Sequence, residues 1–438
     1  MNYKEALRYL DSFVDYEKIG YKSRRLFNLK RMRHLAQVFG NPQDNYPSIH
    51  IAGTKGKGST AFFISGILKE ANLKVGLYTS PHLTDPRERI RVNNEMISED
   101  DFAYHAAEIK KMPINGKLAF RPTYFEIFTI LTFNYFKAQK IDFGVIEVGL
   151  GGRLDATNII KPVVSVMTPV SYDHTNILGN SLEKIAGEKA GIIKKGCIVV
   201  SASQEENALK AIQKKCKSAG AKLTLVGKDI VFQEKQCNPE KETFNIRGMQ
   251  GKYENCTIHL LGRHQILNAT TAVGVAECLI KKGVKISKEN IKNGLEKTQN
   301  PGRCEIISRK PYIILDGAQN RASAKALADT VKRNFEFEHL ILVLGISKGK
   351  DVKGIAEELA PLADNAILTK ANTERAEDPH LIKKFITGKN VTLADSVKEA
   401  LEKAKNEASG KDLILVTGSF FVTGEIKEAI FAQEKILA

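Results

Sequence analysis

The sequence contains no tryptophan and only six cysteines, and no two cysteines form a C-x-x-C pair. Zinc sites and disulfide frameworks need closely spaced cysteines, so this usage argues against both and favours a reducing compartment. No apolar run reaches the roughly eighteen residues that a membrane-spanning helix needs. Charged residues interrupt the N-terminal MNYKEALRYLDSF, which predicts an amphipathic helix and not a signal peptide. We expect a cytoplasmic protein without a membrane partner.

Acidic residues are fewer than basic ones: 50 aspartates and glutamates stand against 66 lysines and arginines, a formal net charge of +16 at pH 7. Such a balance suits anionic partners. A nucleic-acid site would interleave basic residues with aromatic ones, but here the basic residues are scattered over helix-like segments such as AIQKKCKSAGAK. We expect a solvated basic surface with small anionic ligands and no nucleic-acid partner.

At 438 residues the chain is too long for a single hydrophobic core, so two domains are expected. From residue 48 onward, short β-rich runs alternate with helix-length segments. Runs that are apolar on both faces predict a mainly parallel sheet covered by helices on both sides. Residues 228–262 alternate polar and apolar positions and predict a small antiparallel sheet. Helices are expected at about 264–282 and 287–297.

The segment KTQNPGRCE combines Asn, Pro and Gly and is the strongest linker signal in the chain. Beyond it the alternation of strands and helices starts again at YIILDG, LILVLG, NAILTK, NVTLAD and DLILVTG. We therefore predict two α/β domains, residues 1–298 and 299–438, joined near residues 298–303.

The segment IAGTKGKGST, residues 51–60, is written like a phosphate-binding loop with altered spacing. The usual loop, G-x-x-x-x-G-K-[ST], cradles phosphates with its backbone N–H groups and places its lysine on them. Here only two residues separate Gly53 from Gly56, and an extra glycine, Gly58, follows Lys57. A strand is predicted before the turn and an amphipathic helix after it, as phosphate binding requires. A plain strand-to-helix turn is the alternative.

Three further segments place polar residues at predicted strand ends. Glu147, in EVGLGGRLDATN, would lie where open α/β sheets bind ligands, and is either a Mg²⁺ ligand or a cap of the next turn. His174, in SYDHTNILGN, is by itself a packed loop histidine, and Lys189 a surface lysine on a helix capped by Asn180. Asp316, in YIILDGAQN, is by itself a turn residue before a helix that begins at about residue 321.

Taken in order, these segments resemble one family. The chain is similar to the folylpolyglutamate synthase/dihydrofolate synthase family, a branch of the Mur-type ATP-dependent amide ligases. The likeness rests on the ordered set GTKGKGST, LYTSPHLTDPRERIRVN, EVGLGGRLDATN, DHTNILGNSLEKIAGEKAGIIK, PGR and ILDGAQN. It extends from FNLKRMRHLAQVFGNPQ to LVTGSFFVTGE, nearly the whole chain. The family's loop reads G-T-x-G-K-G-[ST], so the altered spacing is the family's own form.

The resemblance implies a fold and a reaction. The N-terminal domain would be P-loop and Mur-ligase-like, with a mainly parallel sheet and a small antiparallel patch, and the C-terminal domain Rossmann-like α/β. ATP would convert a pteroate or folate carboxylate into an acyl phosphate, from which L-glutamate forms an amide. Two Mg²⁺ sites and a monomer are expected. The carboxylate stays open between dihydropteroate, a reduced folate or both. The alternatives are another Mur-type amino-acid ligase and, more distantly, a basic nucleic-acid-binding protein.

The resemblance also implies roles for individual residues. Metal ligands would be Ser59, Ser80, Glu147, His174 and Lys189, the lysine as a carbamate. ATP would contact Gly53, Thr54, Gly56, Lys57, Gly58, Ser59, Thr60, Asn268, Arg303 and Asp316. The catalytic residues would be Lys57, His174 and Lys189. The pterin-side pocket would include Arg31 of the segment FNLKR, Thr123, Phe125, Arg153 and Asp155.

Two positions depart from the family pattern. Lys55 stands in the loop where asparagine is frequent, which adds a positive charge beside the phosphates. Gln319 stands where the family's DGAHN motif has histidine. An amide forms hydrogen bonds but does not titrate near neutral pH, which argues against a proton-transfer role at position 319.

Overall fold

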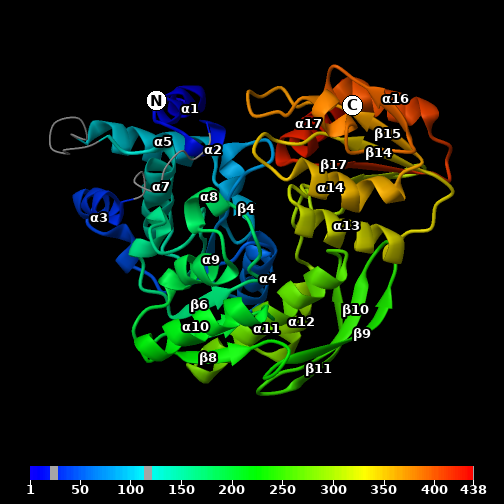
Figure 1. Ribbon diagram of the computed structural model, residues 1–438. Helices are drawn as coiled ribbons and strands as arrows, with labels where there is room; N and C mark the ends of the chain where they lie inside the picture. The colour runs from blue at the N-terminus through cyan, green and yellow to red at the C-terminus, as the bar shows by residue number, and fades with distance from the viewer. Residues whose placement is uncertain (20–27, 113–120, 438) are drawn as a thin grey trace.

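The computed structural model describes residues 1–19, 28–112 and 121–437. An eight-stranded and a three-stranded sheet form its N-terminal part, and a six-stranded sheet forms its C-terminal part. In Figure 1 the C-terminal elements, coloured from yellow to red, gather on one side of the molecule, and the blue to green elements lie opposite. This is the α/β fold in two parts that the sequence predicts.

One large sheet carries the N-terminal part. Its strands are β1 (Ser48–Ala52), β2 (Val75–Tyr78), β3 (Ile90–Val92), β4 (Glu95–Met96), β5 (Phe143–Glu147), β6 (Val164–Met167), β7 (Ile198–Ser201) and β8 (Lys222–Leu225). They follow the order β4-β3-β2-β5-β1-β6-β7-β8. The pairs β2–β5, β5–β1, β1–β6, β6–β7 and β7–β8 are parallel. Strand β3 pairs antiparallel with both β2 and β4. The parallel core agrees with the prediction.

Helices cover both faces of this sheet. They are α1 (Tyr3–Asp11), α2 (Tyr16–Ile19), α3 (Leu29–Val38), α4 (Lys57–Glu70), α5 (Glu99–Lys111), α7 (Tyr124–Ala138), α8 (Thr175–Leu178), α9 (Leu182–Lys189), α10 (Glu206–Ala219), α11 (Arg263–Lys281) and α12 (Lys288–Glu296). One core contains α4, α11 and α12, and another contains α1, α3, α5 and α7. In the described part of the chain, no helix combines the length and the apolar character needed to cross a membrane.

The predicted antiparallel patch is a three-stranded sheet. Its strands are β9 (Val231–Cys237), β10 (Glu242–Arg247) and β11 (Lys252–Ile258). They pair in the order β11-β10-β9, with both pairs antiparallel. Phe244, Ile246 and Tyr253 are buried in the core that contains α11. The alternation of polar and apolar residues therefore marks one packed and one exposed face.

The C-terminal part is a second, smaller α/β unit. Its strands are β12 (Glu305–Arg309), β13 (Tyr312–Leu315), β14 (Leu340–Leu344), β15 (Asn365–Leu368), β16 (Asn390–Leu393) and β17 (Leu413–Thr417). Its helices are α13 (Arg321–Asn334), α14 (Val352–Leu359), α15 (Pro379–Lys383), α16 (Val397–Glu407) and α17 (Phe420–Leu437). The five predicted strands are parallel, and β12 adds an antiparallel edge strand. The sequence did not reveal β12 because its residues are only partly buried.

The linker between the two parts starts from a tight helix contact. A Cβ on Gly294 of α12 would lie 2.4 Å from Ile67 Cα of α4, so only glycine fits there. Four residues later, Thr298 Oγ1 donates to Gly294 O at 2.6 Å. Asn300 Nδ2 then donates to Ser59 Oγ at 3.2 Å. The predicted division at residues 298 and 299 falls between α12 and β12, and we propose it as the domain boundary.

Candidate active site

Three neighbouring strands end together at one edge of the large sheet. In the β1 register, Ile51 pairs with Glu147 of β5, and Ala52 pairs with Met167 of β6. The segments that follow β1, β5 and β6 therefore leave the sheet side by side. In open α/β sheets this carboxyl edge is where ligands bind.

The phosphate-loop segment joins β1 to α4, and the N-terminus of α4 has no side-chain cap. Gly56 is the N-cap of α4, with φ at 77° and no side-chain cap. A Cβ at this position would lie 2.2 Å from Asn268 Oδ1 of α11. The N–H of Thr60 donates to Gly56 O at 2.9 Å, which leaves the N–H groups of residues 57–59 without a helical partner. These donors and the positive end of the helix dipole form an anion-binding turn.

The first half of the loop is turned toward β6. The N–H groups of Thr54 and Lys55 donate to Pro169 O at 2.9 and 3.2 Å. Thr54 Oγ1 donates to Ser171 O and accepts the Ser171 N–H, both at 3.1 Å. The predicted ATP contact at Thr54 therefore has no free donor in this arrangement. The amides at the start of α4 are the ones that remain available.

Glu147, at the end of β5, is a buried carboxylate beside the loop. It is 4% exposed. Its Oε2 accepts the Ser80 N–H at 3.1 Å, and its Oε1 lies 3.8 Å from Lys57 Nζ. Burial raises the pKa of Glu147, and the Lys57 ammonium opposes that rise. The pair places one negative and one positive group at the phosphate turn.

Lys189 is the last residue of α9 and is 5% exposed. The interpretation as a surface lysine, drawn from its helix alone, is therefore wrong. Its Nζ donates to Gly53 O at 2.7 Å, and this bond holds the lysine side chain against the phosphate-loop segment. Burial, and then the nearby Lys57 ammonium, lower the pKa of Lys189 to about 7. A neutral amine is thus accessible at this position near physiological pH.

His174 precedes α8 and lines the cavity described below, so it differs from the packed loop histidine that its position alone suggests. Burial lowers its pKa to about 4, which keeps the imidazole neutral at pH 7.

The next helix, α9, begins one residue later than predicted. Its N-cap is Ser181 and not Asn180, because Ser181 Oγ accepts the Lys184 N–H at 3.3 Å.

The predicted metal ligands do not form a ready-made cluster. Across residues 1–19, 28–112 and 121–437, no three His, Cys, Asp or Glu side chains are grouped closely enough to hold a metal ion. Glu147 and His174 therefore do not belong to one such group, and the Ser59 hydroxyl already accepts from Asn300. A Mg²⁺ ion in such a site takes several of its oxygen ligands from a nucleotide and water.

The C-terminal part brings Arg303 and Asp316 toward the phosphate turn. Arg303 and Glu147 line one small cavity. The Arg303 guanidinium stacks over the Phe420 ring at 4.5 Å from its centroid, which fixes the direction of the arginine. Asp316, after β13, accepts the Cys304 N–H at 2.9 Å, and burial raises its pKa. Asp316 is thus tied to the linker that carries Arg303.

A cavity of about 210 Å³ lies between the two parts of the molecule. The N-terminal part lines it with Lys55, Lys57, Ser80, Asp173, His174 and Lys189, among others. The C-terminal part lines it with Gln319, Lys350, Arg375, Phe420 and Phe421. The cavity is therefore closed only by both parts together, and most of its charged side chains are cationic.

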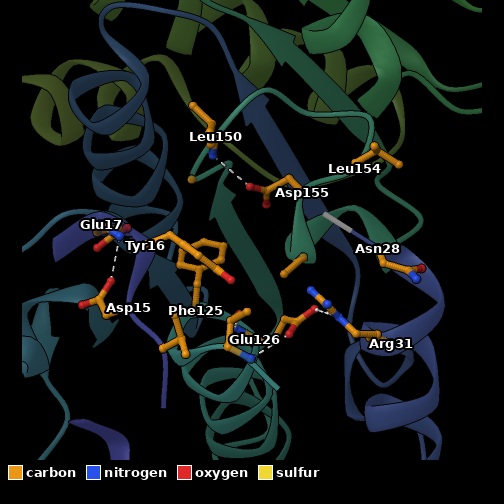
Figure 2. Close-up of a pocket in the computed structure, with 14 residues that line it drawn as sticks. Asp15, Tyr16, Glu17, Asn28, Arg31, Phe125, Glu126, Leu150, Leu154 and Asp155 are labelled. Carbon is orange, nitrogen blue, oxygen red and sulfur yellow. Dashed lines mark hydrogen bonds and ion pairs between the residues drawn. The ribbon is translucent and has the colours of Figure 1, made fainter. Parts of the chain in front are cut away.

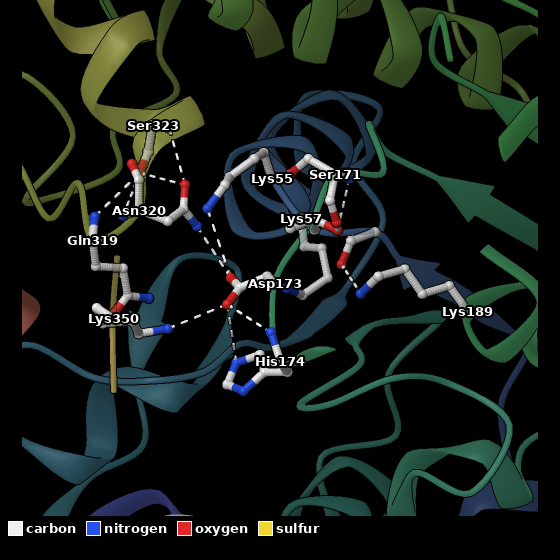
Figure 3. A network of polar contacts seen from close by, with 12 residues as sticks. Lys55, Lys57, Ser171, Asp173, His174, Lys189, Gln319, Asn320, Ser323 and Lys350 are labelled. Carbon is white, nitrogen blue, oxygen red and sulfur yellow. Dashed lines mark hydrogen bonds and ion pairs between the residues drawn. The ribbon is translucent and has the colours of Figure 1, made fainter. Parts of the chain in front are cut away.

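Asp173 connects the two parts inside this cavity (Figure 3). Its Oδ1 lies 3.4 Å from Lys350 Nζ, and its Oδ2 accepts from Asn320 Nδ2 at 3.1 Å. Lys55 Nζ lies 3.8 Å from Oδ2. Burial alone would raise the pKa of Asp173, but Lys350, His174 and Lys55 lower it well below its ordinary value. Asn320 is also the N-cap of α13, so its side chain serves both the helix and the contact with Asp173.

A smaller pocket adjoins the cavity and shares Asp15 and Glu17 with it (Figure 2). Four residues predicted for the pterin side line this pocket: Arg31, Thr123, Phe125 and Asp155. Thr123 caps α7, and Arg31 Nε pairs with Glu126 Oε1 at 3.1 Å. Asp155 is 2% exposed and accepts the Leu150 N–H at 2.9 Å.

Arg153 is the exception among the predicted substrate residues. Its side chain is 47% exposed and pairs with Glu188 at 3.2 Å, away from the pocket. Glu188, near the end of α9, attracts the Arg153 guanidinium, and the motif around Arg153 does not reveal this contact. The segment FNLKR starts at Phe27, which lies outside the described residues.

Several cavity residues were not predicted from the sequence, and Lys350, Arg375 and Glu17 are three of them. Lys350 follows β14 in GISKGKD, and a lysine after a strand is the signal that could have identified it. Arg375 and Glu17 carry no such signal, since they are more than 350 residues apart in the sequence. Arg375 Nη1 nevertheless donates to Glu17 O, from the C-terminal part to α2.

Comparison with known proteins gives consistent matches. The Mur ligase middle domain matches residues 51–276, and the Mur ligase glutamate ligase domain matches residues 302–420. The Bacillus subtilis dihydrofolate synthase/folylpolyglutamate synthase is 32% identical over 92% of this chain and 94% of that protein. The Lacticaseibacillus casei folylpolyglutamate synthase is 31% identical over 98% of this chain and 99% of that protein.

Solved structures are similar over the same length. The Mycobacterium tuberculosis folylpolyglutamate synthase complexed with ADP has a TM-score of 0.89 and 30% identity, covering 98% of both chains. E. coli FolC in complex with DHPP and ADP has a TM-score of 0.87 and 29% identity, covering 99% of both chains. The whole two-part arrangement, and not a single domain, is therefore shared.

Proposed function

The chain belongs to the folylpolyglutamate synthase/dihydrofolate synthase family of Mur-type ligases, and from this membership we propose how its cleft works. It is an ATP-dependent ligase that joins a pteroate or folate carboxylate to L-glutamate through an amide bond. One observation carries the proposal: Lys55 and Lys57 of the phosphate-loop segment, the Asp173 carboxylate and Lys350 of the C-terminal part line a single cavity.

The first step activates the carboxylate, which is by itself a poor electrophile. A carboxylate oxygen attacks the γ-phosphorus of ATP, the bond from that phosphorus to the bridging oxygen breaks, and ADP leaves. Little covalent help is needed, but negative charge must be stabilised. The amides at the start of α4 and the Lys57 ammonium supply that stabilisation. Arg303 and Asp316 approach the nucleotide from the C-terminal part, and Asn268 supports the loop at Gly56.

The second step forms the amide. The glutamate ammonium first loses a proton, the neutral nitrogen then attacks the acyl carbon, phosphate leaves, and the nitrogen loses a second proton as the amide forms. An acyl phosphate also reacts with water, so enclosure by both parts of the molecule protects it. The contacts of Asp173 with Lys350 and Asn320 support this closed arrangement.

The residues around the turn fit Mg²⁺, which would neutralise phosphate charge during transfer. Glu147 offers a buried carboxylate, His174 a neutral imidazole, and Ser59 and Ser80 hydroxyl groups. Lys189 fits after carbamylation: its neutral amine adds CO₂, a proton leaves, and the ammonium site becomes an anionic one. The lowered pKa of Lys189 supports that reaction. We propose two such metal sites.

We propose that the smaller pocket holds the pterin side of the substrate, with Arg31, Thr123, Phe125 and Asp155 around it. Because the pocket and the cavity share Asp15 and Glu17, a substrate bound in the pocket would extend its carboxylate into the cavity, toward the phosphate turn. The carboxylate is dihydropteroate, a reduced folate or both, since the relatives carry both names. All six cysteines are free thiols, which supports a cytoplasmic location. We propose a monomer.

The test is ADP release with ATP, Mg²⁺ and L-glutamate, with dihydropteroate and tetrahydrofolate supplied separately. We expect turnover with at least one of them and a glutamylated product by mass spectrometry. No turnover with either, together with turnover on a muramoyl nucleotide, would show that another Mur-type ligase activity is the right one.

A further inference from the structure

A chain of three buried side chains leads from the middle of the large sheet to the smaller pocket. His50 lies on β1 and is fully buried, and its Nε2 is 2.8 Å from Thr157 Oγ1. Thr157 is fully buried in the short 3-10 helix η4 (Ala156–Ile159), and its Oγ1 lies 2.5 Å from Asp155 Oδ1. Of the three residues, Asp155 alone lines the pocket. The other two therefore support Asp155 from behind.

The hydrogen positions along this chain follow from the partners. Burial keeps the His50 imidazole neutral, with its pKa lowered to about 3, so the ring carries one proton. Its Nδ1 has no hydrogen-bond partner among the described residues, and an unpaired buried N–H is costly, so the proton lies on Nε2. Nε2 then donates to Thr157 Oγ1. Thr157 has one hydroxyl hydrogen, which it donates to Asp155.

Asp155 receives three hydrogen bonds from neutral donors. The Thr157 hydroxyl and the Thr157 N–H both reach Oδ1, the latter at 3.0 Å. The Leu150 N–H reaches Oδ2 at 2.9 Å (Figure 2). Burial raises the pKa of Asp155, and these hydrogen bonds oppose that rise. Thr157 supplies two of the three, so it does most to keep this carboxylate ionised.

The ionised form decides what Asp155 can bind. A carboxylate accepts hydrogen bonds and cannot donate one, and its two oxygens offer about four acceptor positions. Three of these positions are occupied. The remaining one can take an N–H or O–H group of the molecule that fills the pocket. A protonated Asp155 would offer a donor instead, so Thr157 and His50 determine which kind of group the pocket accepts.

We propose that Thr157 and His50 are positioning residues of the smaller pocket, and that they hold Asp155 as the acceptor of an N–H group on the pterin side of the substrate. Neither residue touches the substrate itself. The inference rests on the proposed function, since it explains how one wall of the proposed pterin pocket is kept ready to bind.

The experiment measures steady-state kinetics of the wild type, Thr157→Val and Thr157→Ser, with dihydropteroate or tetrahydrofolate varied. Valine has the shape of threonine but no hydroxyl. Thr157→Val should therefore raise the KM for the folate substrate about tenfold, the size of one lost hydrogen bond to a charged group. We expect kcat and the KM values for ATP and L-glutamate to stay within about twofold, because the lost contact affects substrate binding alone. Thr157→Ser keeps the hydroxyl and should stay within about threefold of wild type.

The other end of the chain is tested at His50. His50→Leu removes the N–H that orients the Thr157 hydroxyl and should raise the same KM by about threefold, because Thr157 keeps its own hydrogen. His50→Gln restores an N–H donor and should lower that KM again. Thr132→Val, whose buried hydroxyl donates to Phe128 O within α7, is the matched control. Circular dichroism and the thermal midpoint check folding, and if Thr157→Val does not fold, the two His50 variants decide.

A double-mutant cycle with Asp155→Asn separates positioning from a general structural role. If Thr157 acts through Asp155, adding Thr157→Val to Asp155→Asn should raise the KM for the folate substrate no further. A residue that only stabilises the fold would add its own effect in the double variant.

The outcomes distinguish the inference from the function on which it rests. A wild-type enzyme that turns over neither folate substrate overturns both. With an active wild type, the inference alone is overturned if Thr157→Val leaves the KM for the folate substrate unchanged or raises the KM for ATP equally. A loss in Thr157→Ser as large as that in Thr157→Val, or full additivity with Asp155→Asn, overturns it as well.

Discussion

The Lys57 ammonium lies 3.8 Å from the Glu147 carboxylate, between the first turn of α4 and the end of β5. Each group neutralises the other, so a phosphate that takes Lys57 as its partner would release Glu147 for a cation. Both partners of a magnesium–nucleotide complex thus have a counterpart in one buried ion pair.

The first prediction concerns Lys57→Ala. We expect ATP-dependent ligation to fall by about 10²- to 10³-fold or more, because the variant loses a positive charge that stabilises phosphoryl transfer. ADP release at saturating ATP measures the loss, and the thermal midpoint checks the fold. Lys69→Ala, at the other end of the same helix, is the matched control. Wild-type turnover of Lys57→Ala would contradict the phosphate-turn interpretation.

The second prediction concerns the C-terminal contribution. Arg303→Ala and Asp316→Ala should each raise the KM for ATP by about tenfold or more, the cost of a lost charged contact. Phe420→Leu should give a smaller rise, because Phe420 supports the Arg303 guanidinium without being charged itself. Steady-state kinetics with ATP varied measure all three. If both charged variants keep wild-type kinetics, the closed cleft does not bring these residues to the nucleotide.

The third prediction concerns Lys189. Lys189→Ala should lose most activity, and formate or acetate should restore part of it, because a small carboxylate can occupy the place of the carbamate. Removing CO₂ from the buffers should lower wild-type activity in the same way. Lys184→Ala, on the exposed side of the same helix, should change neither property. An active Lys189→Ala enzyme, or an unmodified Lys189 by mass spectrometry of the native protein, would count against the carbamate.

The fourth prediction concerns pH and stability at His50. This residue of β1 is fully buried, with its Nε2 at 2.8 Å from Thr157 Oγ1, and burial lowers its pKa from 6.5 to about 3. Below pH 6.5 the unfolded chain binds a proton that the folded chain rejects, so stability is full above pH 6.5 and falls as the pH drops toward 3. The contribution approaches about 1.4 kcal/mol per pH unit.

His50→Leu should therefore weaken the dependence of the thermal midpoint on pH between 6.5 and 4. Near pH 7.5 its stability should change little, because His50 Nδ1 has no hydrogen-bond partner among the described residues and Thr157 keeps its bond to Asp155. An identical pH dependence in both proteins would show that His50 does not remain neutral in the fold.

The fold was largely predictable because its signals are local. The buried strands are apolar runs in the sequence. The glycines at the start of α4 mark a turn, and at position 56 no residue other than glycine could form it. The short edge strand β12 escaped because it is half-exposed. The choice of Ser181 over Asn180 as a cap was missed because both side chains can accept an amide hydrogen, and only the backbone decides between them.

Several residues that line the cavity could be singled out from the sequence, but their contacts could not. Glu147 ends β5 and His174 follows β6, so their place at one edge of the large sheet follows from topology, whereas Asp316 follows β13 of the other sheet. The burial of Lys189 depends on Gly53, 136 positions earlier in the chain. The pairing of Lys55 with Asp173 and Lys350 depends on how two domains face each other. No local pattern encodes that relationship.

The glycine contact between α12 and α4 gives the molecule a fixed pivot. With no side chain at residue 294, the helix before the linker rests directly on the backbone of α4, and Asn300 holds the linker to Ser59. Any rotation of the C-terminal part therefore has its axis beside the phosphate turn. Displacements grow with distance from an axis, so such a rotation would leave Arg303 beside the phosphate turn and would open the far side of the cleft.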